Sequence, residues 1–216
     1  MKRPMLKILL AIGSLVLVVV VGVCGWLFVY TGDLPDFDHL SQFAPDSPTV
    51  VSDPCLASAS TSIPVDRIGK PLQDALAVAE PPQVQPLQIA RSLMCNPPRG
   101  MLMYQLNVLR LNWHIRMHFS KQQIFVIYAN RVYLGPGLTG IEKASKELFH
   151  KESDTLRIGD AALIAGLIRA PAAYSPYTHP DRALERRNKV LELMVAQGKL
   201  SAADAARQDS TPLGTQ

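Results

Sequence analysis

The sequence has only three cysteines in 216 residues, and none of them forms a C-x-x-C pair. A small scaffold held together by many disulfides is therefore excluded. Glycine accounts for 13 residues without a periodic repeat, which excludes a collagen-like fibre. Charged residues make up 19% of the chain and hydrophobic residues 48%, so the chain is not wholly disordered and must contain a packed core. The length allows one ordinary domain with attachments, or two very small domains.

The net charge of +4 combines two regions of opposite sign. Residues 31–90 carry eight acidic groups against two basic ones, whereas residues 91–216 carry 17 basic groups against 10 acidic ones. A basic surface can bind nucleic acid, anionic lipid headgroups or a phosphate-bearing substrate, and composition does not choose among them. The choice depends on the compartment in which the chain resides.

An uncharged run of 23 residues, from Ile8 to Tyr30, indicates that compartment. As a helix it would be about 34 Å long, enough to cross a hydrocarbon layer of roughly 30 Å. The run exceeds the apolar core of a cleaved secretory signal, so we expect an uncleaved transmembrane anchor. Lys2, Arg3 and Lys7 precede the run and predict a cytoplasmic N-terminus. The rest of the chain is then expected in the periplasm of a bacterial cell, as a single-pass protein of the inner membrane.

This placement limits the partners and the chemistry. Nucleic acid is not expected as a partner of the basic half outside the inner membrane. An oxidising compartment would allow Cys55 and Cys95 to form a disulfide, although two lone thiols do not establish one. His114 and His118 lie one helical turn apart and could share a metal ion, but the sequence offers no third ligand nearby, so no metal site is predicted.

Proline content and helical periodicity divide the rest of the chain. Eleven of the 17 prolines fall between residues 31 and 100, which predicts few long elements there. We expect a tether over residues 31–70 after the anchor at residues 1–30, then a helical domain at residues 71–208 and a flexible tail at residues 209–216. The pattern is almost entirely helical from about Met101 onward, so the fold class is mainly α. The expected elements are a short strand at Thr49–Ser52 and helices at Pro71–Glu80, Leu87–Cys95, Ser120–Val132, Leu138–Phe149, Leu156–Arg169, Arg182–Gly198 and Ser201–Gln208.

Local signals mark two boundaries inside the helical region. Ser120 followed three residues later by Gln123 is typical of a capping box at a helix start. Gly135, Gly137 and Gly140 predict a turn in which the backbone adopts positive φ or another segment approaches closely.

The segment Ser120–Lys151 resembles the fourth motif of the family-51 glycosyltransferases, the bacterial enzymes that polymerise peptidoglycan glycan strands from lipid II. The segment Leu156–Ala205 resembles the fifth motif and its trailing helices. The resemblance implies a small lysozyme-like helical domain on a membrane anchor, and it leaves the use of a divalent cation open. The matching residues are Lys121, Ile124, Tyr128, Asn130, Gly135, Gly140, Ala144, Phe149 and Lys151 in the fourth motif, and Ala161, Ala162, Gly166, Pro171 and Pro176 in the fifth.

The first motif of the family, E-D-x-x-F-x-x-H-x-G, begins with the glutamate proposed as the general base. Glu80 stands at that position, but Pro81 and Pro82 follow it. The resemblance implies that Glu80 is catalytic, whereas an equally ordinary role would be a charge that ends a short helix. Asn130 of the fourth motif is a candidate substrate-binding residue, with a structural hydrogen-bonding role as its alternative.

The region of the second and third motifs departs further from the family. In RGMLMYQLNVLR only Gly100 and Gln105 match the second motif, and the resemblance makes Gln105 a candidate substrate-binding residue. Only 39 residues separate Glu80 from Ser120, too few for both motifs and the family's mobile jaw segment. At four positions where the family has a charged or polar residue, this chain has an apolar one. These are Met101, Leu102 and Leu109, and Val126 in the fourth motif.

Three hypotheses remain open at this point. The first is a shortened, catalytically impaired family member that binds lipid II, a glycan strand or a cell-wall synthase. The second is an active enzyme with Glu80 as its base, which requires Glu80 in an open groove with at least two cations. The third is a membrane-tethered interaction protein unrelated to cell-wall substrates, which an exposed apolar patch without a groove would favour. A product that folds poorly is a further possibility.

Overall fold

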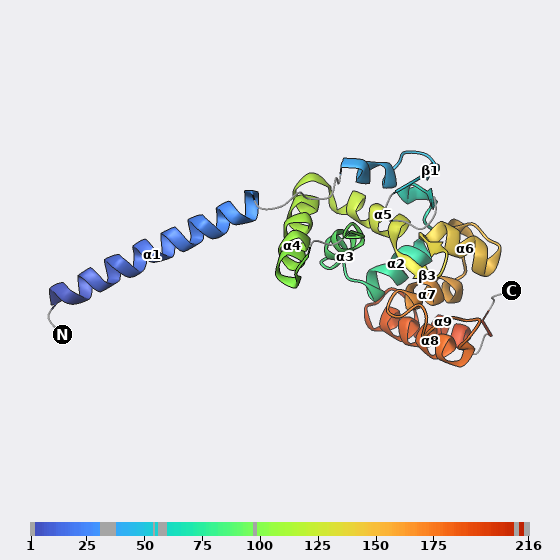
Figure 1. The fold of residues 1–216 in the computed structure, drawn as a ribbon. Helices are drawn as coiled ribbons and strands as arrows, with labels where there is room; N and C mark the ends of the chain where they lie inside the picture. The colour runs from blue at the N-terminus through green and yellow to red at the C-terminus, as the bar shows by residue number, and fades with distance from the viewer. Residues whose placement is uncertain are drawn as a thin grey trace.

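The computed structural model describes residues 3–30, 38–53, 55, 60–96, 99–209 and 212–213. A long helix, α1 (Arg3–Tyr30), extends away from a body of shorter helices (Figure 1). The side chains of α1 are described only at Leu10 and at residues 12–25. Within the described part of the chain, no helix is both long and apolar enough to cross a membrane, so the anchor stays a prediction. Five of the eight residues of the expected tail at residues 209–216 lie outside the described residues.

The body is mainly α, as expected. Its two sheets each consist of two short antiparallel strands, β1 paired with β2 and β3 paired with β4. The elements are η1 (Asp38–Phe43), β1 (Thr49–Val51), β2 (Ser60–Ser62), η2 (Val65–Arg67), α2 (Lys70–Ala79), α3 (Gln85–Ser92), α4 (Met101–His118), α5 (Lys121–Arg131), β3 (Tyr133–Gly135), β4 (Leu138–Thr139), α6 (Ile141–Phe149), η3 (Ser153–Thr155), α7 (Ile158–Leu167), α8 (Pro180–Ala196) and α9 (Ala202–Asp209).

Helix α7 lies at the centre of the core. Every residue from Gly159 to Leu167 is buried, and α7 packs against both α2 and α8. A helix that is hydrophobic on all sides is stable only when neighbours cover all of it. The absence of a side chain at Gly166 allows close packing with α8, because a Cβ there would lie 3.1 Å from Cγ of Arg186. The helices on either side of α7 are seen at the lower right of Figure 1.

The expected tether contributes to this core. Leu40 and Phe43 of η1 are fully buried, and Ile63 and Ile68 are 3% and 1% exposed. The packed body therefore begins at about residue 39, not at residue 71 as the proline content suggested. Short 3₁₀ turns and strands tolerate frequent prolines while still burying alternate apolar side chains. We call residues 38–55 the strap.

The local signals of the helical region are confirmed. Ser120 Oγ accepts a hydrogen bond from the backbone N–H of Gln123 at 3.2 Å, and the side chain of Gln123 accepts one from the backbone of Ser120 at 2.9 Å. Gly140 has φ of 83°, and a Cβ there would lie 2.6 Å from the carbonyl oxygen of Asn130. The expected helix at Leu138–Phe149 starts only at Ile141, because the residues before it form β4 and this turn.

Helix α4 has no counterpart among the individual helices expected from the sequence. Its apolar residues occupy two faces, so they form no single stripe of helical period. Val108, Leu111 and Ile115 are buried, and α4 packs mainly against α3. The opposite face exposes Met101, Leu102, Leu109, Trp113 and Met117, each at least 50% accessible.

Candidate functional site

A cleft of about 530 Å³ lies between α3, the C-terminal end of α5 and the segment that follows α7. Glu80 enters it from the end of α2, where the backbone N–H of Glu80 donates to the carbonyl of Leu76 at 2.9 Å. The helix ends there because Pro81 and Pro82 cannot continue its hydrogen bonding. Charged and polar groups in the lining come from several elements: Glu80, Arg91, Ser92, Tyr128, Arg131 and Arg169.

The carboxyl group of Glu80 lies in an environment that makes it a stronger base than an exposed carboxylate. Burial raises its pKa above the ordinary value, and the positive charges of Arg169 and Arg186 oppose the rise without cancelling it. A desolvated carboxylate accepts a proton more readily than an exposed one. Such a perturbed group in a cleft is a candidate functional residue.

Tyr128 of α5 lines the same cleft and is 3% exposed. Burial raises the pKa of its hydroxyl, and the negative charge of Glu80 raises it further. Among the described residues, the Tyr128 hydroxyl has no hydrogen-bond partner. An unsatisfied buried hydroxyl costs about 1–3 kcal/mol, a cost that a polar group of a bound ligand could remove. The sequence analysis counted Tyr128 only as a motif match.

The other two candidate residues do not line this cleft. Gln105 is exposed on α4, where its Nε2 contacts Sδ of Met101 at 3.7 Å. Asn130 is fully buried, and its Nδ2 donates to the carbonyls of Phe43 at 2.8 Å and Ile63 at 2.9 Å. Its Oδ1 accepts from the backbone N–H of Ile63 at 3.1 Å. The amide of Asn130 therefore holds the strap and the chain after β2 against α5, which is the structural alternative considered for it.

The cations of the cleft were not assigned individually from the sequence. Arg91 and Arg169 both line it, and both are exposed, so their guanidinium groups are accessible to a ligand. Arg91 follows the helical pattern of α3 and Arg169 lies within the fifth-motif segment. Nothing in either pattern alone showed that the two arginines would face the same cleft as Glu80.

No metal centre accompanies this cleft in the described part of the chain. There, no group of three or more His, Cys, Asp or Glu side chains is arranged to hold a metal ion. His114 and His118 stack with ring centroids 5.7 Å apart, and Nδ1 of His118 lies 2.9 Å from the carbonyl oxygen of His114.

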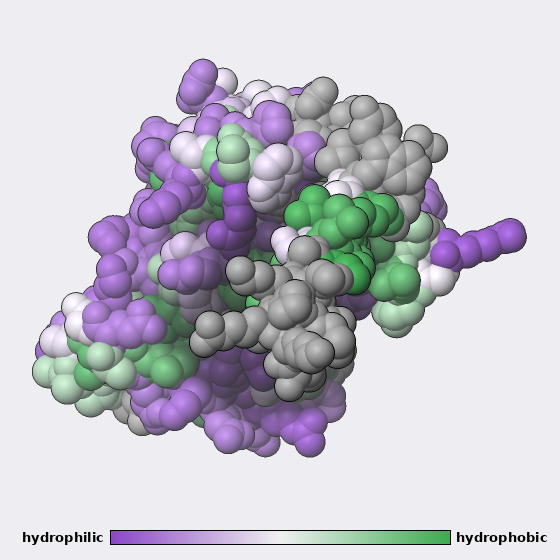
Figure 2. Space-filling view, turned by 90° about the vertical axis from the view of Figure 1, so that its left-hand side faces the viewer, coloured by the Kyte–Doolittle hydropathy of each residue, from purple (hydrophilic) through white to green (hydrophobic). Residues whose placement is uncertain are grey.

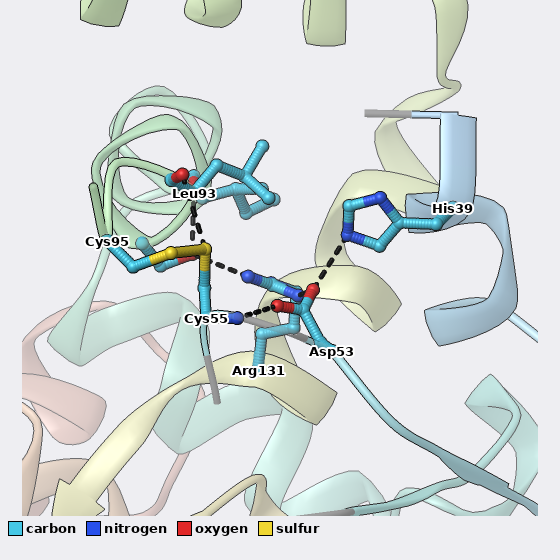
Figure 3. Close-up of a disulfide and its surroundings, with 8 residues drawn as sticks. His39, Asp53, Cys55, Leu93, Cys95 and Arg131 are labelled. Carbon is cyan, nitrogen blue, oxygen red and sulfur yellow. Dashed lines mark hydrogen bonds and ion pairs between the residues drawn. A yellow bond between two sulfur atoms is a disulfide. The ribbon is translucent and has the colours of Figure 1, made fainter. Parts of the chain in front are cut away.

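One wall of the cleft is joined to the strap by polar and covalent links (Figure 3). Cys55 and Cys95 form a disulfide, the pairing that the sequence analysis left open. Beside it, the carboxylate of Asp53 pairs with Nη1 of Arg131 and with Nε2 of His39, the latter at 2.7 Å. Burial by itself would raise the pKa of Asp53, but Arg131 and the hydrogen bonds hold it below its ordinary value.

Comparison with known proteins shows which sequences and structures this chain resembles. The chain is 40% identical over 99 residues to penicillin-binding protein 1A of Aquifex aeolicus, a match that covers 46% of this chain and 14% of that protein. It is 27% identical over an alignment of 227 residues to penicillin-binding protein 1A/1B of Bacillus subtilis, covering 87% of this chain and 25% of that protein. The chain thus spans a quarter or less of the length of these relatives.

A solved structure and a family model complete the comparison. The crystal structure of penicillin-binding protein 1A from Haemophilus influenzae matches 70% of this chain and 17% of its own, with a TM-score of 0.49 and 22% identity. The transglycosylase family model matches residues 86–195, which is more than half of the chain. The motifs at residues 120–205 fall largely within this range. The chain therefore belongs to the transglycosylase family, the family-51 glycosyltransferases.

Proposed function

We propose that this protein is an active peptidoglycan glycosyltransferase that joins the disaccharides of lipid II and releases the lipid diphosphate. The observation that carries the proposal is the position of Glu80. Its carboxylate lies in an open cleft together with Arg91 and Arg169. This is the arrangement that separates an active enzyme from an impaired family member, and the sequence alone gave more weight to impairment.

Glu80 would act as the general base. A hydroxyl of the acceptor sugar attacks the anomeric carbon of the donor, and its proton passes to the carboxylate of Glu80. The raised pKa of Glu80 suits this role, because a carboxylate with a higher pKa is a stronger base. Tyr128 also lines the cleft, and its buried hydroxyl, which has no hydrogen-bond partner among the described residues, would become a donor to the bound sugar only if the ligand reaches it.

The arginines would stabilise the leaving group. As the bond between the anomeric carbon and the diphosphate breaks, negative charge grows on the diphosphate oxygens. Guanidinium groups form paired hydrogen bonds with phosphate, so cations held in place before the reaction lower its barrier. Arg91 of α3 and Arg169 of the segment after α7 both line the cleft and are accessible for this purpose.

The substrate would reach the cleft from the membrane surface. We propose that α1 is an N-terminal anchor in the inner membrane, with the body in the periplasm. Figure 2 views the molecule from the side toward which α1 projects, so that the exposed hydrophobic side chains of α1 lie in front of a largely hydrophilic body. The exposed apolar face of α4, with Leu109, Trp113 and Met117, belongs to this end of the body and would contact lipid.

A second candidate function is binding of lipid II or nascent glycan without turnover. It is favoured by the positions where the family has charged or polar groups and this chain does not. Met101, Leu102 and Leu109 are exposed on α4 and do not line the cleft, while Val126 is buried in α5. On this alternative the cleft recognises the substrate, and the protein acts together with cell-wall synthases.

The test is glycan-chain formation from labelled lipid II in detergent by the full-length protein. Polymer is expected from the wild type, with a loss of about 10²–10⁴-fold in Glu80→Gln. Wild-type activity should fall as the pH is lowered through the raised pKa of Glu80, because the base becomes protonated. Glu147→Gln, which changes an exposed glutamate of α6 outside the cleft, serves as the matched control.

The outcome separates the two candidates. If the wild-type protein is folded and binds lipid II but makes no polymer, the proposal of an active enzyme is wrong and the binding function is supported. Polymer from both the wild type and Glu80→Gln would exclude Glu80 as the base.

A further inference from the structure

The cleft wall that carries Ser92 and Arg131 is joined to the strap at two neighbouring points. Cys55 of the strap is bonded to Cys95, three residues beyond the end of α3. Asp53, two residues before Cys55, has a fully buried carboxylate that pairs with Arg131 at the end of α5. Figure 3 shows the disulfide and the ion pair side by side.

These two links are mechanically coupled through the backbone of Cys55. The N–H of Cys55 donates to Oδ1 of Asp53 at 2.6 Å, while Oδ2 receives Arg131 and His39. The carboxylate is therefore held from both sides. A displacement of Cys55 away from α3 would remove one of these hydrogen bonds and shift the group that orients Arg131.

Arg131 in turn organises the wall of the cleft. Its Nη2 lies 3.4 Å from Oγ of Ser92, and both residues line the cleft. Its guanidinium stacks over the ring of Phe43 with Cζ 4.7 Å from the centroid, so the strap also covers it from behind. Within the described residues, its Nε is buried without a hydrogen-bond partner. Asp53 is thus the anion that fixes the orientation of Arg131.

We propose that the Cys55–Cys95 disulfide and Asp53 position Arg131 and α3 as one wall of the Glu80 cleft, and thereby set the affinity for the lipid-linked diphosphate donor. The inference rests on the proposed function, since it concerns the substrate of that site. Cys55, Cys95 and Asp53 are positioning residues that do not touch the substrate. Glu80 lies at the end of α2 and meets this wall only at the start of α3, where Nε2 of Gln85 donates to its backbone carbonyl at 3.1 Å. The disulfide lies beyond the other end of α3, so opening it weakens binding and leaves the proton transfer intact.

The test is to open the disulfide in the folded protein and to measure both kinetics and local order. A dithiol reductant supplies two electrons and two protons, gives the thiols of Cys55 and Cys95, and itself becomes a cyclic disulfide. A Cys24→Ser background removes the exposed free thiol, so that thiol labelling reports only on this bond. We expect reduction to raise KM for lipid II about tenfold and to change kcat less than about twofold, the pattern of lost ground-state binding.

A matched variant and an independent measurement accompany this test. The double variant Cys55→Ser with Cys95→Ser should show the raised KM before any reductant is added and should not respond to it. Amide hydrogen exchange should accelerate in α3 and at the end of α5 on reduction, whereas α7 and α8 should keep their protection. The exchange measurement does not depend on turnover.

The outcomes distinguish this inference from the proposed function. An unchanged KM together with unchanged exchange in α3 would overturn the positioning role. Loss of protection in α7 as well would also overturn it, because the bond would then stabilise the whole fold and not one wall. If the oxidised wild type makes no polymer, the proposed function fails, and the exchange in α3 still supports or overturns the positioning role.

Discussion

The two walls of the Glu80 cleft are stabilised by different kinds of interaction. The wall after α7, with Ile168 and Arg169, rests on the apolar core formed by α2, α7 and α8. The wall formed by α3 and the end of α5 is fastened to the strap by the Cys55–Cys95 disulfide and the pair of Asp53 with Arg131. A wall held by packing tolerates changes in pH and redox state, whereas a wall held by ionic and covalent links responds to both.

The largest effect is expected in the wall formed by α3 and the end of α5, which we call the cross-linked wall. Asp53→Asn should lower the free energy of unfolding by about 3–5 kcal/mol, because it leaves the charge of Arg131 buried without its partner. Urea unfolding followed by circular dichroism measures the change. Asp46→Asn, in the same strap but exposed, should change stability by no more than about 0.5 kcal/mol.

The effect of Asp53→Asn should depend on pH in a defined direction. The pKa of Asp53 is lower in the folded protein than in the unfolded chain, so its stabilising contribution is complete above the unfolded value. The contribution is lost as the pH falls through the folded value. The difference between wild type and variant should therefore shrink on acidification, and a difference that is constant over that range would contradict the ionic role.

The second prediction concerns the wall after α7, which rests on the apolar core and which we call the packed wall. Ile164 of α7 is fully buried, and Ile164→Ala should cost about 2–5 kcal/mol through lost burial and the cavity left behind. This loss should be the same across the pH range in which the effect of Asp53→Asn shrinks. A loss under about 1 kcal/mol would mean that packing on α7 does not support this wall.

A smaller effect is expected at the start of α5, the helix that carries Tyr128 and Arg131 to the cleft. Ser120→Ala removes the side-chain acceptor of the capping box and should cost about 1 kcal/mol. Gln122→Ala, exposed two residues later and outside the capping hydrogen bonds, is the control. Thermal unfolding of the two variants in parallel measures the difference, and equal melting temperatures would show that the cap is not used.

The smallest expected effect has the opposite sign. Because the pKa of Glu80 is raised in the folded protein, its ionised form opposes folding near neutral pH. Glu80→Gln should therefore raise Tm slightly at neutral pH, and the gain should vanish as the pH falls through the raised pKa. A Tm below that of the wild type at neutral pH would indicate that Glu80 serves structure and not catalysis.

Features that depend on residues close together in the chain could be predicted from the sequence to a large extent. The motif residues from Ser120 onward, the capping box and the turn at Gly140 depend on neighbours a few residues away, and the structure confirms them. Glu80 was assigned to the site by its motif position, and the structure places it in the cleft. Local chemistry and spacing were sufficient for these features.

The cross-linked wall could not be predicted in the same way. Asp53 and Arg131 are 78 residues apart, and no local pattern connects them. The role of Asn130 was ambiguous because an amide suits both a substrate and a backbone, and only its burial decides between them. Helix α4 escaped individual assignment because one apolar face packs on α3 while the other is exposed. Pairing between residues far apart in the chain and exposure of apolar side chains can be recognised only in the three-dimensional fold.

The hydrogen bonds of Asn130 also determine the order in which the protein can be completed during synthesis. Its amide binds Phe43, which lies 87 residues earlier in the chain. At 5–20 residues per second, Asn130 would emerge roughly 4–17 s after Phe43. During that interval Leu40 and Phe43, both fully buried in the finished fold, are without this partner. The apolar side chains of the nascent strap therefore stay without this part of their packing until α5 has been synthesised.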